Sequence, residues 1–499
     1  MSKQIPHWVG GKPWEGASDR RGEVFDPALG TVQAEVGLAS VADVDTAVAT
    51  AATAFRDWSS TTLATRSRIL FDFRAELLRR RGELASAITA EHGKVLDDAQ
   101  GEIARGLEVV EYACGLSSLL KGGFSEQVST GVDVTSIRQA VGVCAVVTPF
   151  NFPVMVPLWF TPIAIACGNT VVLKPSEKVP SAALILAECW AGAGLPDGVF
   201  NVLHGDAAAV NRLLEHPDVA SVSFVGSTPV ARHIYETGTR HGKRVQALGG
   251  AKNHMVVLPD ADLDAAANAA VSAGFGSAGE RCMAVSVIVA VDPVGDDLVA
   301  RIAHKMAGLR HGDGRRGTDM GPLVTRQHRD RVAGYLDTGV ADGAELVVDG
   351  RAGVADGAAE GFWLAPTLFD RVPLSSAVYR DEVFGPVLSV VRVPSFDAAL
   401  DLVNANPYGN GVALFTESGS RARRFQSEVQ VGMVGINVPI PVPAAAYSFG
   451  GWKSSLFGDS HAYGEDGVRF FTRSKVVTSR WPRRSAPAAG VDLSFPGNG

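Results

Sequence analysis

The chain has 499 residues, of which 46% are hydrophobic and 20% charged, and its formal net charge is -7. That length is too great for one compact core, so we expect a soluble globular protein of two or three domains. The mildly acidic charge gives no reason to expect nucleic acid or an anionic membrane as a partner.

Cysteine usage and the first residues indicate the compartment. The five cysteines are an odd number without paired or zinc-ligand spacing, which argues against a disulfide framework and against a metal site. Residues 1–14 lack the apolar run and cleavage site of a signal peptide. Residues 139–173 carry no charge, but repeated prolines interrupt them, so we predict no membrane span. A cytoplasmic location is therefore expected.

Helical and strand patterns alternate along the chain, which predicts α/β layers with parallel sheets. In the first half, helices are expected over 43–58, 65–91, 99–120 and 181–193, and strands over 142–148, 169–173, 199–203 and 221–224. In the second half, helices are expected over 263–277 and 297–309, and strands over 284–291, 346–348, 387–392, 411–415 and 432–436. The break between two α/β domains then falls near Lys252. The tail from Pro482, rich in Pro, Gly, Ala and Ser, is expected to be loose.

Cys282 is the candidate nucleophile, in the segment Gly279-Glu280-Arg281-Cys282 between an expected helix and an expected strand. A neighbouring guanidinium lowers the pKa of a thiol, and we expect Arg281 to act in this way. The alternative is an ordinary buried cysteine, which is our interpretation of the other four.

Four further motifs stand out: the first two below follow expected strands, the third opens a helix, and the fourth lies in a loop. They are Pro149-Phe150-Asn151-Phe152-Pro153, Lys174-Pro175-Ser176-Glu177, Phe224-Val225-Gly226-Ser227-Thr228 and Glu382-Val383-Phe384-Gly385-Pro386. The Asn151 carboxamide could stabilise an oxyanion, and the N–H groups after Gly226 could face a pyrophosphate. Each motif alone is weak, since each could be an ordinary turn or loop, and the usual G-x-G-x-x-G fingerprint is absent.

In this order the five motifs resemble those of the aldehyde dehydrogenase superfamily, over nearly the whole chain. The resemblance implies two α/β domains with parallel-type sheets plus a small oligomerisation β-element. It places residues 1–122 and 141–252 in an NAD-binding domain and residues 253–465 in a catalytic domain. Residues 123–140 and 466–499 would form the oligomerisation element and tail, with 123–138 and a last strand over 468–478 assembling a homotetramer, a dimer of dimers.

The resemblance also implies residue roles. Cys282 would be the nucleophile, and Asn151 with the Cys282 N–H would stabilise the oxyanion. Residues implied to bind NAD are Thr148, Phe150, Lys174, Glu177, Lys178, Gly226, Ser227, Gly249, Glu382 and Phe384. Glu177 would repel a 2′-phosphate, which favours NAD over NADP.

Ala247 indicates the branch of the superfamily. Hydrolytic members carry Glu-Leu-Gly-Gly where this chain has Ala247-Leu248-Gly249-Gly250, and that Glu activates water. With Gly250-Ala251-Lys252-Asn253-His254 and Arg281, the chain resembles the CoA-acylating branch that acts on methylmalonate and malonate semialdehydes. The resemblance implies oxidation to an enzyme thioester, loss of CO2, and transfer to CoA as propionyl-CoA or acetyl-CoA. Glu280, where many members have Gln, is expected to point away from the nucleophile and not to replace the lost base.

The substrate carboxylate needs a cation, and a guanidinium can hold it with two hydrogen bonds. Arg281 is the first candidate and Arg105 the second, although Arg105 could instead be solvated or paired with Glu102 or Glu108. Two other functions stay open: a hydrolytic aldehyde dehydrogenase with another base, and a catalytically silent member of the fold. The preferred semialdehyde, the pathway (valine or inositol breakdown) and the CoA-binding residues are not predicted.

Overall fold

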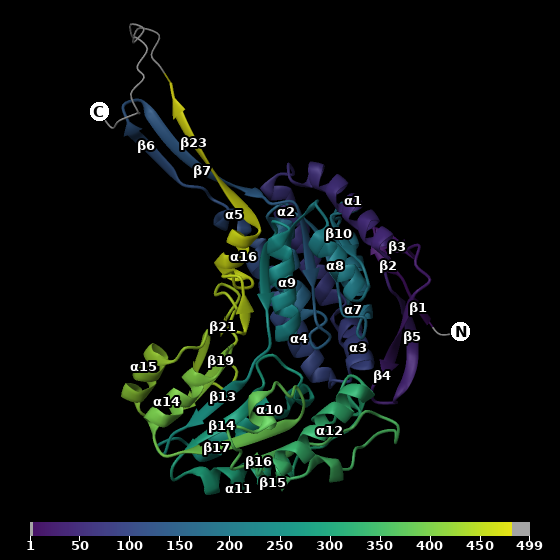
Figure 1. Ribbon diagram of the computed structural model, residues 1–499. Helices are drawn as coiled ribbons and strands as arrows, with labels where there is room; N and C mark the ends of the chain where they lie inside the picture. The colour runs from purple at the N-terminus through teal and green to yellow at the C-terminus, as the bar shows by residue number, and fades with distance from the viewer. Residues whose placement is uncertain (1–2, 482–499) are drawn as a thin grey trace.

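The computed structural model of the protein describes residues 3–481. They form two large sheets, each with helices against it, and a slender β-arm that projects away from both (Figure 1). Among these residues no helix combines the length and the apolar character that crossing a membrane requires. The uncharged stretch 139–173 instead forms strand, loop, helix and strand, all largely buried.

The first large sheet has the strand order β22-β12-β11-β8-β9-β10-β2-β3, and its central strands from β12 to β10 are parallel. Its strands are β2 (His7–Val9), β3 (Lys12–Trp14), β8 (Val143–Val147), β9 (Thr170–Lys174), β10 (Phe200–Val202), β11 (Val219–Val225), β12 (Arg244–Leu248) and β22 (Leu456–Phe457). Side chains of β8 alternate between two apolar cores, because successive strand residues point to opposite faces. This sheet is therefore buried on both sides.

Nine helices accompany this sheet in the first half of the described chain. They are α1 (Val41–Trp58), α2 (Leu63–Arg79), α3 (Arg81–His92), α4 (Leu96–Cys114), α5 (Leu116–Leu119), α6 (Met155–Ala166), α7 (Ser181–Gly192), α8 (Ala207–Glu215) and α9 (Thr228–Arg240). One core packs α2, α3, α4, α6 and α7, and the other packs α1, α8 and α9. The start of α1 is fixed by a capping box in which Ser40 and Asp43 satisfy each other's N–H groups.

The second large sheet has the order β15-β16-β17-β14-β13-β19-β20, parallel except for the edge strand β15. Its strands are β13 (Asn253–Val257), β14 (Val285–Val291), β15 (Glu345–Val348), β16 (Thr367–Asp370), β17 (Val387–Val393), β19 (Gly411–Phe415) and β20 (Met433–Ile436). Its helices are α10 (Leu263–Phe275), α11 (Gly295–Met306), α12 (Arg326–Ala341), α13 (Ala377–Arg380), α14 (Phe396–Ala405) and α15 (Gly419–Glu428). They share a third apolar core, so the predicted α/β class with two parallel-type sheets is confirmed.

Smaller elements complete the described chain. The β-arm consists of the antiparallel strands β6 (Phe124–Ser129), β7 (Val132–Ala140) and β23 (Thr472–Arg480) (Figure 1). A three-stranded sheet near the N-terminus has the order β1 (Lys3–Ile5), β5 (Thr31–Gly37), β4 (Arg21–Asp26). The remaining elements are β18 (Tyr408–Gly409), β21 (Trp452–Lys453), α16 (Gly464–Phe470) and the short 3-10 helices η1 (Gly276–Gly279), η2 (Gly314–Arg316) and η3 (Gly350–Ala352).

Three predicted elements differ from the structure. The helix expected over 65–91 is broken at Arg80, whose backbone leaves helical geometry (φ -101°, ψ 12°), into α2 and α3. The helix expected over 99–120 ends at Cys114, and the next residues turn once more as α5. The strand expected from Val468 begins only at Thr472, because Val468 and Phe470 are buried within α16. The predicted loose tail, 482–499, lies outside the described residues.

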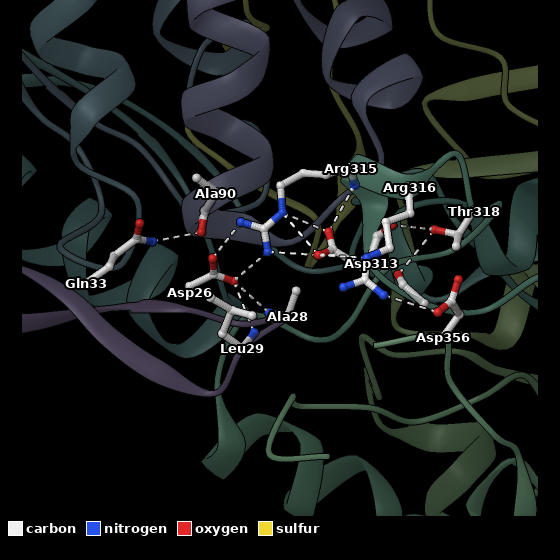
Figure 2. Close-up of polar contacts among 11 residues, drawn as sticks. Asp26, Ala28, Leu29, Gln33, Ala90, Asp313, Arg315, Arg316, Thr318 and Asp356 are labelled. Atoms are coloured by element: carbon white, nitrogen blue, oxygen red, sulfur yellow. Dashed lines mark hydrogen bonds and ion pairs between the residues drawn. The ribbon is translucent and has the colours of Figure 1, made fainter. Parts of the chain in front are cut away.

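A cluster of charges ties the N-terminal sheet to the segment before α12 (Figure 2). The Arg315 guanidinium donates to Asp26 at 2.7 Å and to Asp313 at 2.8 Å. Asp26 ends β4 and also accepts the N–H groups of Ala28 and Leu29. The same sheet contacts α3 where Gln33 donates to the Ala90 carbonyl. The contact between Arg315 and Asp26 joins segments 289 residues apart in the sequence.

Candidate active site

A cavity open to solvent, with a volume of about 640 Å³, lies at the ends of several parallel strands of the first sheet. Its walls come from the loops after β8, β9, β11 and β12, from α12, and from the loops around Cys282 and Glu382. The lining residues are Pro149, Phe150, Asn151, Lys178, Val225, Gly226, Ser227, Thr228, Pro229, Gly249, Gly250, Cys282, Thr325, Gln327, His328, Arg331, Asp381, Glu382, Phe384 and Tyr408. All five predicted motifs therefore lie at or beside one cavity.

Cys282 follows η1 and is partly exposed to the cavity. Its carbonyl accepts hydrogen bonds from the carboxamides of Asn253 (2.9 Å) and Asn410 (3.0 Å), which fix the peptide behind the thiol. Burial, together with the nearby Glu382 carboxyl, raises the pKa of the Cys282 thiol to about 12. Arg281 opposes these effects only weakly, since its guanidinium is paired with Asp98 at 2.6 Å. The prediction that Arg281 leaves this thiol with a lowered pKa is therefore wrong.

Asn151 is held from two sides. The side-chain Nδ2 of Asn151 donates to the Glu280 main-chain carbonyl at 2.9 Å. The main-chain carbonyl of Asn151 accepts from the Lys94 ammonium at 2.6 Å. Lys94 is fully buried and pairs with Glu102 at 2.8 Å. The other Glu102 oxygen accepts the N–H groups of Val154 (2.8 Å) and Met155 (3.1 Å) at the start of α6. This buried ion pair thus fixes the whole loop that carries Asn151 beside the nucleophile.

The residues predicted to bind NAD divide into two groups. Seven of them line the cavity: Phe150, Lys178, Gly226, Ser227, Gly249, Glu382 and Phe384. The other three, Thr148, Lys174 and Glu177, lie at the ends of β8 and β9 outside that lining. Lys174 donates to the Gly205 carbonyl at 3.1 Å and lies 3.6 Å from Glu177, and burial lowers its pKa. The Thr148 hydroxyl is buried without a partner.

The loop after β11 presents a helix end to the cavity. Ser227 is the N-cap residue of α9 and its side chain makes no capping bond, so N–H groups of the first turn remain for a bound anion. Across from it, Gly250 donates its N–H to the Thr228 hydroxyl at 2.9 Å. A Cβ at Gly250 would collide with the Glu382 carboxyl, so a larger residue there would force the carboxyl or the loop to move.

Glu382 and Phe384 also line the cavity, and Glu382 lies next to Gly250. The Glu382 carboxyl accepts the Ala251 N–H at 2.8 Å, and burial raises its pKa to about 7. Phe384 has a left-handed backbone (φ 56°) and its carbonyl accepts the His328 Nε2–H at 2.7 Å. Its ring meets Phe150 edge-on at 6.0 Å. The strained turn therefore places an aromatic side chain at the cavity.

Ala247 does not line the cavity. It lies within β12, opposite Phe224 on one side and Phe457 on the other, and is fully buried in the apolar core. The segment that follows Ala247 lines the cavity at Gly249 and Gly250, which carry no side chain. The carboxylates that do line the cavity are Asp381 and Glu382. This strand end therefore presents no base to Cys282.

The two candidate carboxylate-binding arginines are both engaged. Arg281 pairs with Asp98, as described above. Arg105 pairs with Glu108 at 2.8 Å and donates to the carbonyls of Val442 (3.3 Å) and Pro443 (3.1 Å). It lines a separate small pocket with Met155, Trp159 and Tyr463. The ion pair with Glu108, one of the alternatives left open for Arg105, is thus what the structure shows.

Several site residues escaped the sequence analysis. Gln327, His328 and Arg331 lie on α12, and Tyr408 lies on β18. None of these belongs to a motif, and α12 is a polar helix with few buried residues. The buried pair of Lys94 and Glu102 was also missed, because nothing in the sequence distinguishes those charges from solvated ones.

The profile of the aldehyde dehydrogenase family matches residues 14–477. The match covers most of the chain, and the cavity combines that family's motifs around one partly exposed cysteine. The chain belongs to the aldehyde dehydrogenase family.

Named relatives are similar over nearly their whole length. A malonate-semialdehyde dehydrogenase from Pseudomonas aeruginosa is 52% identical over 479 residues, covering 96% of each chain. Malonate-semialdehyde dehydrogenase 1 from Geobacillus thermodenitrificans is 46% identical, covering 96% of this chain and 99% of the relative.

Two solved structures have the same fold as this chain. A methylmalonate-semialdehyde dehydrogenase from Oceanimonas doudoroffii has a TM-score of 0.95 and 50% identity, covering 97% of this chain and 99% of its own. A Sinorhizobium meliloti protein, solved with NAD and described as a candidate methylmalonate-semialdehyde dehydrogenase, has a TM-score of 0.96 and 49% identity over the same shares.

Proposed function

We propose that this protein is an NAD-dependent, CoA-acylating dehydrogenase of methylmalonate semialdehyde and malonate semialdehyde. It would oxidise and decarboxylate them to propionyl-CoA and acetyl-CoA. The observation that carries the proposal is a cysteine at a large cavity whose facing strand end consists of Gly249 and Gly250. A nucleophile without a water-activating carboxylate at that position suits transfer of the acyl group to a thiol. The names of the similar proteins from Pseudomonas and Oceanimonas support the choice of substrate.

The cavity fits NAD in charge and shape. The N-terminus of α9 offers N–H groups to a pyrophosphate, and Gly249 and Gly250 leave room for it. By resemblance to the family, Lys174 and Glu177, which lie 3.6 Å apart, would hold the adenosine ribose hydroxyls, and a Glu177 carboxylate would disfavour a 2′-phosphate. Glu382 would accept hydroxyls of the other ribose. Bound NAD supplies the acceptor for the hydride that leaves the aldehyde carbon.

Cys282 would supply the nucleophile. Its thiol must lose a proton before the sulfur attacks the aldehyde carbon, because the thiolate is the reactive form. The oxygen of the resulting tetrahedral adduct would be stabilised by the Cys282 N–H and by the Asn151 carboxamide, one of whose two N–H bonds is already directed at the Glu280 carbonyl. Loss of hydride then leaves a thioester on Cys282.

The substrate carboxylate explains the remaining steps. It lies β to the thioester carbonyl, so loss of CO2 leaves an enolate that the same N–H donors would stabilise. Arg281 and Arg105 are the proposed cations for this carboxylate, and each would exchange its present partner, Asp98 or Glu108, for the substrate. After protonation of the enolate, the CoA thiol attacks the thioester and frees Cys282.

We also propose the setting of the enzyme. The β-arm carries exposed apolar side chains on Phe124, Ile137, Val476 and Val477, which suits assembly of a homo-oligomer, with a dimer of dimers as the expected form. Free cysteines and the absence of a membrane-spanning helix within residues 3–481 suit a cytoplasmic enzyme. Its substrates would come from valine or inositol breakdown, and no nucleic acid or membrane partner is proposed.

The deciding experiment measures NADH formation from methylmalonate semialdehyde with and without CoA, together with the identity of the acyl product. Sustained turnover only with CoA, giving propionyl-CoA, would support the proposal. Equal turnover without CoA, giving a free acid, would favour the hydrolytic alternative. Glu382, a cavity carboxyl with a pKa of about 7, would then be the first base to test.

A further inference from the structure

The segment before the nucleophile has an unusual backbone. Ser277 (φ 54°), Ala278 (φ 53°) and Gly279 (φ 73°) are three consecutive residues in the left-handed region. For residues with a Cβ this conformation is strained, and it persists only where surrounding contacts hold it. The question is therefore which contacts hold this turn.

The side chain of Glu280, the next residue, provides contacts that are fully buried. Its side chain has no exposed surface and extends toward α3 and α12 rather than toward Cys282, as predicted. One carboxyl oxygen lies 3.5 Å from His92 Nε2, and the other lies 3.4 Å from His328 Nε2 and accepts the Val324 N–H at 3.4 Å. The carboxyl thus lies between two histidines from different domains of the fold.

The three side chains are neutral together. Burial lowers the pKa of His92 well below its usual value and lowers that of His328 to about 4. Burial likewise raises the pKa of the Glu280 carboxyl well above its usual value. The Nδ1 atom of His92 accepts the Lys94 N–H at 3.3 Å, so Nε2 carries the proton and faces Glu280. The neutral carboxyl is therefore held by packing between the two imidazoles and by the Val324 N–H, not by an ion pair: His92 Nε2 and the carboxyl oxygen beside it have no hydrogen-bond partner, and the His328 Nε2–H is donated to the Phe384 carbonyl.

The main chain of Glu280 connects this buried side chain to the chemistry. Its carbonyl accepts the Asn151 carboxamide N–H at 2.9 Å, and its peptide leads two residues later to Cys282. A shift of this peptide would therefore move the oxyanion donor and the nucleophile at the same time. Reaction rates are sensitive to such small displacements of reacting groups.

We propose that Glu280 is a positioning residue for this reaction: its side chain, held between His92 and His328, fixes the peptide that orients Asn151 and Cys282. The inference deepens the proposed function and rests on it, because the rate it concerns is that of aldehyde oxidation. Glu280 touches neither substrate nor cofactor in this arrangement and acts through Asn151 and the loop of Cys282.

The test compares Glu280→Gln, Glu280→Ala and Glu280→Met with the wild type. Gln has the shape of a neutral carboxyl, so Glu280→Gln should keep kcat within about threefold of wild type. Glu280→Ala and Glu280→Met lose the contacts, and kcat should fall about 30-fold while KM for NAD changes less than about twofold. Met fills the space left by Glu, so kcat and KM can be measured in Glu280→Met even if Glu280→Ala does not fold.

Glu91→Ala is the matched control. Glu91 is another buried carboxyl on α3, its pKa is raised to about 7, and it accepts the Ser181 N–H at 3.0 Å, away from the nucleophile. Its loss should lower the melting temperature but leave kcat unchanged. The proposal is overturned if Glu280→Met and Glu91→Ala lower kcat equally, if Glu280→Gln is as slow as Glu280→Ala, or if the loss lies in KM alone.

A second readout separates this proposal from the proposed function. The four other cysteines are buried, so iodoacetamide reports on Cys282. Its alkylation rate should change at least about threefold in Glu280→Met and not in Glu91→Ala. Wild-type protein that forms no NADH from any semialdehyde would overturn the proposed function. An unchanged alkylation rate in Glu280→Met would overturn the positioning role of Glu280.

Discussion

The two walls of the cavity are built on different principles. The cofactor wall is formed by backbone that approaches closely, at the start of α9 and at Gly249 and Gly250. The nucleophile wall is held by buried ionisable side chains, above all Lys94, Glu102 and Glu280. The cofactor wall depends on the small size of its glycines, and the nucleophile wall depends on the pairing of its buried side chains. Mutations in the cofactor wall should therefore change NAD affinity, and mutations in the nucleophile wall should change kcat.

The largest effect should come from the nucleophile itself. Cys282→Ala should lower kcat for NADH formation by about 10⁴-fold or more, because no other cavity residue can form the thioester. NAD affinity, a property of the other wall, should stay within about twofold of wild type. Stopped-flow NADH absorbance and calorimetric titration of NAD measure the two quantities. Residual turnover near the wild-type rate would remove Cys282 from the mechanism.

Breaking the buried ion pair should give the next largest effect. Lys94→Met removes the ammonium that pairs with the buried Glu102 carboxyl and frees the Asn151 loop, so we expect a loss of about 3–5 kcal/mol in unfolding free energy. The rate constant kcat should fall about 100-fold as the oxyanion donor is displaced. Urea denaturation and steady-state kinetics provide the measurements.

The double variant Lys94→Met/Glu102→Leu is the control for that prediction. Replacing both charges by apolar groups should recover most of the stability, since no unpaired charge remains buried. The rate should stay low, because Asn151 has still lost its Lys94 contact. Full recovery of kcat in the double variant would show that Lys94 acts on stability alone.

On the cofactor wall, Gly250→Ala should weaken NAD binding about tenfold. The added Cβ meets the Glu382 carboxyl, so either the glycine loop or Glu382 must move. Gly101→Ala in α4 is a matched control, because a Cβ there meets nothing within 4 Å and a helical alanine is favoured over glycine. Equal NAD affinities in the two variants, read by calorimetry, would contradict the close-approach argument.

The smallest expected effect is the pH dependence of NAD binding. Burial raises the pKa of Glu382 to about 7 in the protein without cofactor. If only its carboxylate form accepts the ribose hydroxyls, NAD affinity should rise about tenfold between pH 6 and pH 8, and Glu382→Gln should abolish that rise. The same raised pKa means that this group stabilises the fold fully below about pH 4.5, its unfolded value, and that the contribution is lost as pH rises through about 7.

The contrast between the walls also decides what the sequence could predict. Cofactor-wall motifs are short and contiguous, so their resemblance to the family's motifs pointed to Gly226, Gly249, Glu382 and Phe384. Strands such as β8 and β14 were found because buried strands are dense in apolar β-branched residues. The three-residue strands β1, β2 and β3 were missed because so few residues carry no periodic signal.

The nucleophile wall was harder to predict because its contacts join distant segments. Lys94 reaches Asn151, and Glu280 reaches both His92 and His328, across separations that no local pattern encodes. The error over the Cys282 pKa has the same origin. Sequence placed Arg281 beside the thiol but could not show that Asp98, from α4, already neutralises it.

The cluster of Asp26, Asp313 and Arg315 bears on how the enzyme would respond to its surroundings (Figure 2). Both carboxylates are buried, whereas Arg315 is about one-third exposed, so dissolved ions reach only one side of this bridge. Charges withdrawn from water are poorly screened by salt. The bridge that ties the N-terminal sheet to the segment before α12 should therefore hold from dilute buffer to concentrated brine.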